Sequence, residues 1–145
     1  MEIHVMGRGG MEKFSQDEHP FESFAISISD PDRKQLIINL LNQSGIYSVH
    51  HFRFWDEIEP QYGAMTEEDA IMIAKFVLYE HKHKPDAHLV INCEGGVSRS
   101  AGIAAAVAKY FNGDDHYYFH KSRFVPNMRC YRLVLDALHK YGGQS

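Results

Sequence analysis

One short stretch of the chain, Ile91 to Gly102, brings together residue types that can bind and attack a phosphate group. An apolar run leads into Cys93, five residues follow of which two are glycine, and then come Arg99 and Ser100. A strand, a tight loop and a helix N-terminus form an anion site, because backbone N–H groups and the helix dipole converge on it. The guanidinium of Arg99 can hold two phosphate oxygens. A cysteine at the base of such a cradle is expected to be a thiolate nucleophile.

This stretch resembles the Cys-x5-Arg-Ser/Thr signature loop of the protein tyrosine and dual-specificity phosphatases, and the resemblance extends over roughly Tyr47 to Leu138. It implies that Cys93 is the nucleophile and that Ser100 stabilises the departing thiolate in the second step. It also implies that the phosphoryl oxygens are bound by the Arg99 side chain and by the backbone N–H groups of Glu94, Gly95, Gly96, Val97, Ser98 and Arg99. The charges of this cradle match the phosphoryl group, so we expect neither a metal ion nor another cofactor.

A separate loop should supply the acid that protonates the leaving group. In the family that the chain resembles, this acid is an aspartate at the end of the strand before the preceding helix, and Asp56 occupies that position. Glu57 and Glu59 are local competitors, and all three carboxylates could instead solvate a turn. The same resemblance assigns a loop-supporting role to Pro126 and Asn127, although a helix cap explains that pair equally well.

The residue before the nucleophile departs from the family pattern, which usually has histidine where this chain has Asn92. The histidine helps to keep the cysteine ionised and oriented, so we expect a less completely ionised Cys93. A phosphatase-like module that binds phosphate with weak or no turnover is therefore the alternative function. A buried structural cysteine would also follow a core strand, but it explains neither the glycine pair nor the Arg99-Ser100 pair. A sulfur- or arsenate-transferring domain has a similar loop and would need no acid such as Asp56.

The elements that must position these residues follow from hydrophobic periodicity and from turn signals. We expect strands at 2–6, 24–29 and 46–55 and a strand that leads into Cys93, with the strand at 24–29 half-buried. We expect helices at 35–41, from a Thr66-x-x-Asp69 capping box to about 81, at 103–110, at 114–122 and after Asn127, with a flexible glycine turn at 7–10 and a loop at 11–20. This alternation predicts an α/β sandwich with a largely parallel sheet of four or five strands flanked by helices, and it places Cys93 at the carboxyl end of a central strand.

Composition limits the class of protein and its partners. The 145 residues suit one domain, and we expect a single phosphatase-like domain over 1–145. A net charge of -4 argues against a nucleic-acid surface, and no long apolar segment or signal pattern suggests a membrane. The 2 cysteines, Cys93 and Cys130, fit a reducing compartment, so we expect a cytoplasmic protein with Cys130 in the core. Histidines at 81, 83 and 88 lack the spacing of a metal site.

These observations predict a metal-independent phosphomonoester hydrolase that acts on phosphotyrosine in proteins, with phosphoserine and phosphothreonine as further candidates, through a phosphocysteine intermediate. The signature loop carries Glu94 and no lysine, which favours singly phosphorylated substrates, whether proteins or small phosphomonoesters.

Overall fold

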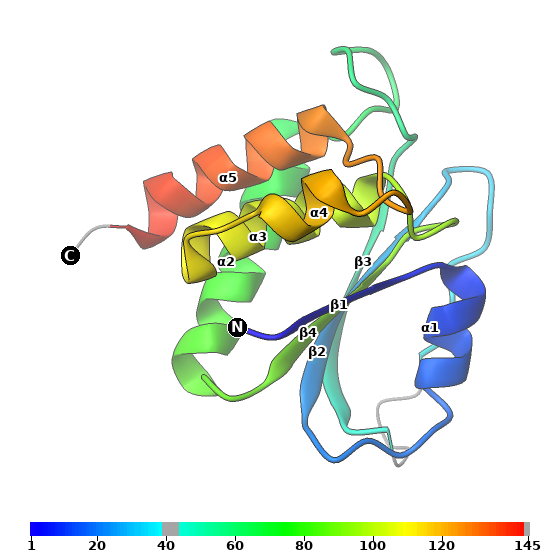
Figure 1. The fold of residues 1–145 in the computed structure, drawn as a ribbon. Helices are drawn as coiled ribbons and strands as arrows, with labels where there is room; N and C mark the ends of the chain where they lie inside the picture. The colour runs from blue at the N-terminus through cyan, green and yellow to red at the C-terminus, as the bar shows by residue number, and fades with distance from the viewer. Residues whose placement is uncertain (39–43, 144–145) are drawn as a thin grey trace.

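The computed structural model describes residues 1–38 and 44–143 of the chain, and its centre is one parallel sheet (Figure 1). The strands are β1 (Ile3–Met6), β2 (Ser23–Ser29), β3 (Ile46–Arg53) and β4 (His88–Asn92). They form a 4-stranded sheet in the order β1-β4-β2-β3, and every neighbouring pair is parallel. The carboxyl ends of all these strands therefore meet at one edge, with the Cys93 strand β4 between β1 and β2.

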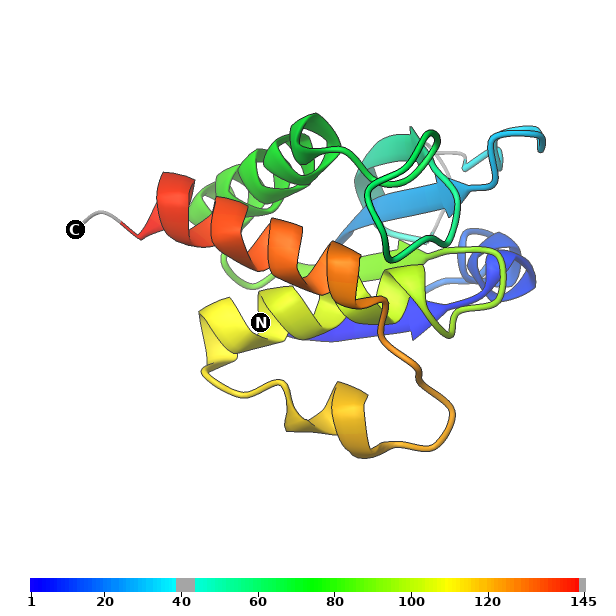
Figure 2. The same ribbon diagram turned by 90° about the horizontal axis from the view of Figure 1, so that it is seen from above.

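Helices cover both faces of this sheet, as Figures 1 and 2 show. Helix α1 (Arg8–Phe14) lies on one face. The other face carries α2 (Glu67–His83), α3 (Arg99–Asn112), α4 (His116–His120) and α5 (Met128–Gly142). The predicted fold class, a parallel α/β sandwich of four or five strands, is thus confirmed.

Side chains that alternate along each strand fill two cores. On β4, Leu89 and Ile91 belong to the large core under α2, α3 and α5, whereas Val90 belongs to the smaller core beside α1. Strand β2 is buried on both faces along its whole length, so the expectation of a half-buried strand was wrong. Its small serines had suggested a solvated face, but a central parallel strand is covered on both sides.

Several helix ends follow their local sequence signals. Thr66 accepts the N–H of Asp69 and the Asp69 carboxylate accepts the N–H of Thr66, which confirms the capping box of α2. Gly113 has φ +76° and ends α3, as the Asn112-Gly113 stop signal predicted. Helix α3 begins at Arg99, earlier than the periodicity of its alanines indicated.

Two predictions for the N-terminal part of the chain were wrong. The glycine-rich segment at 7–10, expected to be a flexible turn, begins α1, which runs on through residues that we expected to form a loop. Met11 is fully buried against the sheet, and this packing outweighs the poor helix propensity of glycine.

The second wrong prediction is the helix expected at 35–41. Residues 35–38 form no helix, and residues 39–41 lie outside the described part of the chain. Leu36 is 4% exposed, Ile37 87% and Ile38 8%, an alternation with the period of extended backbone rather than of a helix. Across the described ranges, no helix combines the length and the hydrophobicity that crossing a membrane requires.

Candidate active site

Cys93 lies where β4 ends, at the carboxyl edge of the sheet, and the loop 94–98 connects it to the first residue of α3. The cysteine is 2% exposed, and its Sγ lies 3.0 Å from the Oγ of Ser100 in the first turn of that helix. The hydroxyl can therefore donate a hydrogen bond to a thiolate at this position. The N-terminus of α3 adds its partial positive charge to the same spot.

The backbone of the loop is held from outside and keeps its N–H groups free. The carbonyl of Glu94 accepts the N–H of Arg8 at 3.1 Å, and the carbonyl of Val97 accepts the N–H of Val125 at 2.9 Å. By contrast, no backbone N–H from 94 to 98 donates to another backbone carbonyl within the described part of the chain. Such a loop offers a set of oriented donors that an anion can satisfy.

Gly96 explains why the loop contains glycine at its centre. Its φ of +70° is a left-handed conformation that other residues adopt at a cost. A Cβ atom there would lie 2.5 Å from the backbone N of Gly7, at the junction of β1 and α1. The loop therefore packs directly against this junction, and the glycine at 96 is required by both its conformation and the space around it.

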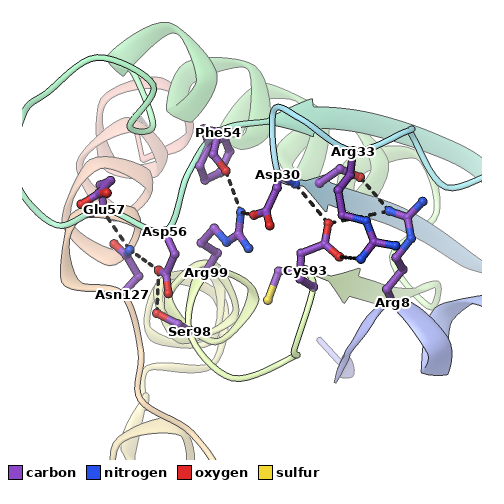
Figure 3. Close-up of polar contacts among 12 residues, drawn as sticks. Arg8, Asp30, Arg33, Phe54, Asp56, Glu57, Cys93, Ser98, Arg99 and Asn127 are labelled. Atoms are coloured by element: carbon purple, nitrogen blue, oxygen red, sulfur yellow. Dashed lines mark hydrogen bonds and ion pairs between the residues drawn. The ribbon is translucent and has the colours of Figure 1, made fainter.

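Arg99 is anchored through one end of its guanidinium (Figure 3). Its Nη1 donates to the backbone carbonyl of Phe54 at 2.7 Å and forms an ion pair with the Asp30 carboxylate at 2.8 Å. The side chain is 5% exposed, and its Nε is buried without a hydrogen-bond partner in the structure. A buried N–H without a partner is costly, and a phosphate oxygen can supply the missing acceptor.

The loop after β3 brings Asp56 to the edge of the cradle (Figure 3). Its Oδ1 accepts two hydrogen bonds of 2.8 Å, one from the Oγ of Ser98 and one from the Nδ2 of Asn127. Asn127 also donates to the carbonyl of Glu57 at 3.1 Å, while its own Oδ1 accepts the N–H of Cys130 and caps α5. Although its side chain is exposed, as that of Glu59 is, Asp56 is thus tethered to the cradle and to α5.

Glu94 contributes more than a backbone N–H to the site. Its carboxylate accepts the N–H of Asp30 at 3.1 Å and pairs with Arg33 at 3.0 Å and with Arg8 at 3.8 Å. Arg8 in turn donates to the Oγ of Ser29 at 3.2 Å. Glu94, the first residue of the loop, therefore connects the cradle to the end of β2 and to the start of α1.

Asn92 is fully buried, and its side chain donates to the backbone carbonyl of Cys93 at 3.2 Å. This hydrogen bond holds the peptide group at the base of the loop rather than the sulfur. Cys130 lies in the core, as expected, and burial raises the pKa of its thiol, with the negative charge of Asp56 as a smaller cause. A neutral, buried Cys130 is a poor nucleophile beside Cys93.

The structure brings together the residues that the signature loop predicted. Cys93, Arg99, Ser100 and the loop at 94–98 form one cradle, and Asp56 lies beside it. Asp30, Arg8 and Arg33 were missed. They come from the segment before Tyr47, where the chain resembles no motif. The position of Asp30 after the strand at 24–29 was an available signal, because the carboxyl ends of parallel strands share one edge.

Within residues 1–38 and 44–143, no group of three or more His, Cys, Asp or Glu side chains is arranged to hold a metal ion.

Comparison with solved structures connects this site to a known fold. The structure of PTPMT1 in complex with PI(5)P matches with a TM-score of 0.60 and 12% identity, covering 96% of this chain and 91% of that one. Tk-PTP in its active form gives a TM-score of 0.54 and 14% identity over 97% and 93% of the two chains. The PTP-2 phosphatase of Cydia pomonella gives 0.55 and 18% over 94% and 85%.

No protein-family model and no curated protein matches the sequence. At these low identities the solved structures show that the chain has the fold of the protein tyrosine phosphatases, and the likeness extends to the fold alone.

Proposed function

We propose that the chain is a cysteine-dependent phosphatase that hydrolyses phosphomonoesters through a phosphocysteine intermediate. The observation that carries this proposal is a set of donors above Cys93 without an acceptor among residues 1–38 and 44–143: the loop N–H groups from 94 to 98 and the buried Nε of Arg99. Donors held in place before the reaction stabilise the charge on transferring oxygens without reorganisation. These donors supply the charge that the phosphoryl group needs, so the proposed reaction requires no metal ion.

In the first step, the sulfur of Cys93 attacks phosphorus, an S–P bond forms, and the P–O bond to the leaving group breaks. Asp56, in its protonated form, donates its proton to the leaving oxygen. In the second step, water attacks phosphorus, Asp56 accepts a proton from that water, and the S–P bond breaks. The hydroxyl of Ser100, 3.0 Å from the sulfur, stabilises the thiolate that leaves.

The substrate class is proposed to be phosphotyrosine in proteins, with phosphoserine and phosphothreonine as further candidates. The carboxylate of Glu94 lies beside the cradle, which favours a single phosphate over a cluster of phosphates. Because PTPMT1 was solved with PI(5)P, a phosphoinositide monophosphate belongs in the substrate panel. The free thiols of Cys93 and Cys130 agree with a reducing compartment, and we place the protein in the cytoplasm.

The direct test is hydrolysis of an aryl phosphate in the presence of EDTA, with vanadate as competitor. Cys93→Ser should abolish turnover while still binding a phosphopeptide, and acid-quenched wild-type enzyme should carry phosphate on Cys93. Turnover by the serine variant within a few-fold of wild type would refute the covalent mechanism. Phosphate binding by wild type without any turnover would favour a phosphate-binding module instead.

Asp56→Asn tests the acid. The variant should lower kcat by about 10²- to 10⁴-fold for a poor leaving group and much less for one that departs as an anion. Glu57→Gln and Glu59→Gln are matched controls on the same loop, and both should leave the dependence on the leaving group unchanged.

A further inference from the structure

A hollow of about 440 Å³ lies beside the acid loop, outside the phosphate cradle. Its lining includes Pro31, Arg53, Trp55, Tyr62 and Asp69. Pro31 directly follows the carboxylate that anchors Arg99, and Trp55 directly precedes Asp56. The hollow therefore borders the active site on the side of β3.

Trp55, one of the two aromatic residues in the lining of this hollow, is held in place by its neighbours. The backbone N–H of Trp55 donates to the backbone carbonyl of Gly63 at 2.7 Å, and this hydrogen bond closes the loop between the two residues. Gly63 has φ +85°, and a Cβ atom there would lie 2.6 Å from the Cδ1 atom of the indole. Trp55 is nevertheless 37% exposed, and Tyr62 is fully exposed at 102%. Large apolar side chains held at a surface beside an active site are typical of a binding subsite.

The charges of the lining point to the chemistry of the ligand. Arg53 is exposed and forms no ion pair with any residue of the described ranges. Asp69, the other charged residue of the lining, accepts the N–H of Thr66 with its Oδ2 and caps α2. The guanidinium of Arg53 is thus free to pair with a ligand, whereas the carboxylate of Asp69 keeps its charge but is held in position by the helix cap.

We propose that this hollow binds an acidic side chain that lies a few residues from the phosphorylated residue of a protein substrate. Arg53 pairs with the carboxylate, and the indole of Trp55 packs against the methylene groups. The proposal rests on the proposed phosphatase function, since the phosphate in the cradle anchors the peptide. Arg53 precedes Asp56 by three residues, a separation of at most about 10 Å at roughly 3.3 Å per residue. An extended peptide spans that distance in about three residues, so the acidic residue belongs within three positions of the phosphotyrosine.

The chain provides a probe of this subsite that does not depend on turnover. Trp55 is its 1 tryptophan, so intrinsic fluorescence reports directly on the hollow. Phosphotyrosine peptides with Glu or Gln at each position within three residues should be titrated into Cys93→Ser. We expect the glutamate peptides to shift the fluorescence and to bind about 2- to 5-fold more tightly than their glutamine partners, with the preference shrinking as salt rises.

Catalytic measurements then test the residue assignment. Wild type should show the same preference for glutamate peptides in kcat/KM. In Arg53→Gln the ratio of kcat/KM for the glutamate peptide to that for the glutamine peptide should fall to about one, while the rate on an aryl phosphate is retained. Lys109→Gln removes the same charge from an exposed position near the far end of α3 and should keep the preference. A preference that survives in Arg53→Gln, or the absence of any preference in wild type, would overturn the proposal.

Two further outcomes distinguish a failure of the proposed acidic-residue subsite from a failure of the proposed phosphatase function. If wild type hydrolyses no phosphate ester but the glutamate phosphopeptides still bind at Trp55 through Arg53, the subsite stands and the phosphatase function fails. If only inositol phosphates, and no peptides, show binding that depends on Arg53, a small phosphorylated ligand replaces the acidic peptide and the inference is wrong.

Discussion

Asn127 performs two tasks with one side chain, and substitutions can separate them. Its Oδ1 caps α5 by accepting the N–H of Cys130 at 2.9 Å. Its Nδ2 tethers the acid loop by donating to Asp56 at 2.8 Å and to the carbonyl of Glu57 at 3.1 Å. The residue is 2% exposed, so in Asn127→Ala water cannot readily take over the hydrogen bonds of the lost amide, and both functions are lost.

The expected stability loss follows from these contacts. An N-cap contributes about 1 kcal/mol, and the two donated hydrogen bonds contribute about 2 kcal/mol or more together. Because Asp56 itself is exposed, we take the lower end of the range for these hydrogen bonds. Asn127→Ala should then lower the free energy of unfolding by about 2–3 kcal/mol in total. For a chain of this size that loss corresponds to a Tm lower by about 4–12 °C.

Asn127→Ser should recover only the cap, because serine is a good N-cap but is too short to donate to Asp56 as asparagine does. Its Tm should rise by about 2–4 °C relative to the alanine variant. Both variants should lose about 5-fold in kcat on a poor leaving group, since Asp56 loses a positioning hydrogen bond of about 1 kcal/mol.

Ser98→Ala is the matched control, because it removes the other donor to the same oxygen of Asp56 without removing a cap. It should lower kcat in the same way and leave Tm nearly unchanged. The assay compares phenyl phosphate with 2,4-dinitrophenyl phosphate, alongside thermal unfolding of each variant. If Asn127→Ser restored both Tm and kcat, the tether to Asp56 would have no part in positioning the acid.

Three further predictions concern the cradle and the pH dependence of stability. Arg99→Lys should weaken vanadate inhibition by at least about 100-fold, because an ammonium group cannot keep the contacts to Asp30 and Phe54 and also hold two oxygens; equal inhibition would contradict the assignment. Gly96→Ala should lower both Tm and vanadate affinity. Gly113 is the matched control, because it has a similar φ of +76° but a Cβ atom there would meet no atom within 4 Å, so Gly113→Ala should lower Tm alone. Burial, and next the neighbouring His88, lower the pKa of His4 below its ordinary 6.5, while Glu2 raises it and His19 lowers it further. The unfolded chain therefore binds a proton on this histidine more readily than the folded chain, so the free energy of unfolding falls as pH falls below about 6.5. His4→Phe should flatten the dependence of Tm on pH between pH 7.5 and 5.5. If the plots of Tm against pH for His4→Phe and wild type were parallel, the assignment to His4 would be wrong.

Local sequence signals were sufficient to predict the structure of a segment wherever its conformation depends only on residues close to it in the sequence. The capping box at Thr66, the stop at Gly113 and the loop between Cys93 and Arg99 are encoded by residues within a few positions of one another. Their geometry depends on backbone conformation and on hydrogen bonds between near neighbours, and these are properties of the local sequence. The parallel sheet also followed from the alternation of apolar strands and helices.

The N-terminal segment shows what the local sequence could not determine. Glycines at 7–10 disfavour a helix, yet buried packing of Met11 against β4 and β2 stabilises α1. The spacing of Leu36, Ile37, Leu40 and Leu41 predicted a helix. Of the described residues 36–38, however, the smaller core buries only the alternate residues Leu36 and Ile38. In both cases contacts between segments distant in sequence outweighed the local preference.

The same distinction applies to the candidate site. The sequence by itself predicted the proposed nucleophile Cys93 together with Arg99 and Ser100, because a phosphate cradle is built from one continuous loop and one helix N-terminus. The family resemblance had suggested a supporting role for Asn127, and the tertiary structure shows that it donates to Asp56. Only the tertiary structure decided what holds Arg99 and Glu94, which are bound by Asp30 and by Arg8 and Arg33. These partners lie on separate elements whose ends meet only after the sheet has formed, so no pattern within a short stretch of sequence specifies them.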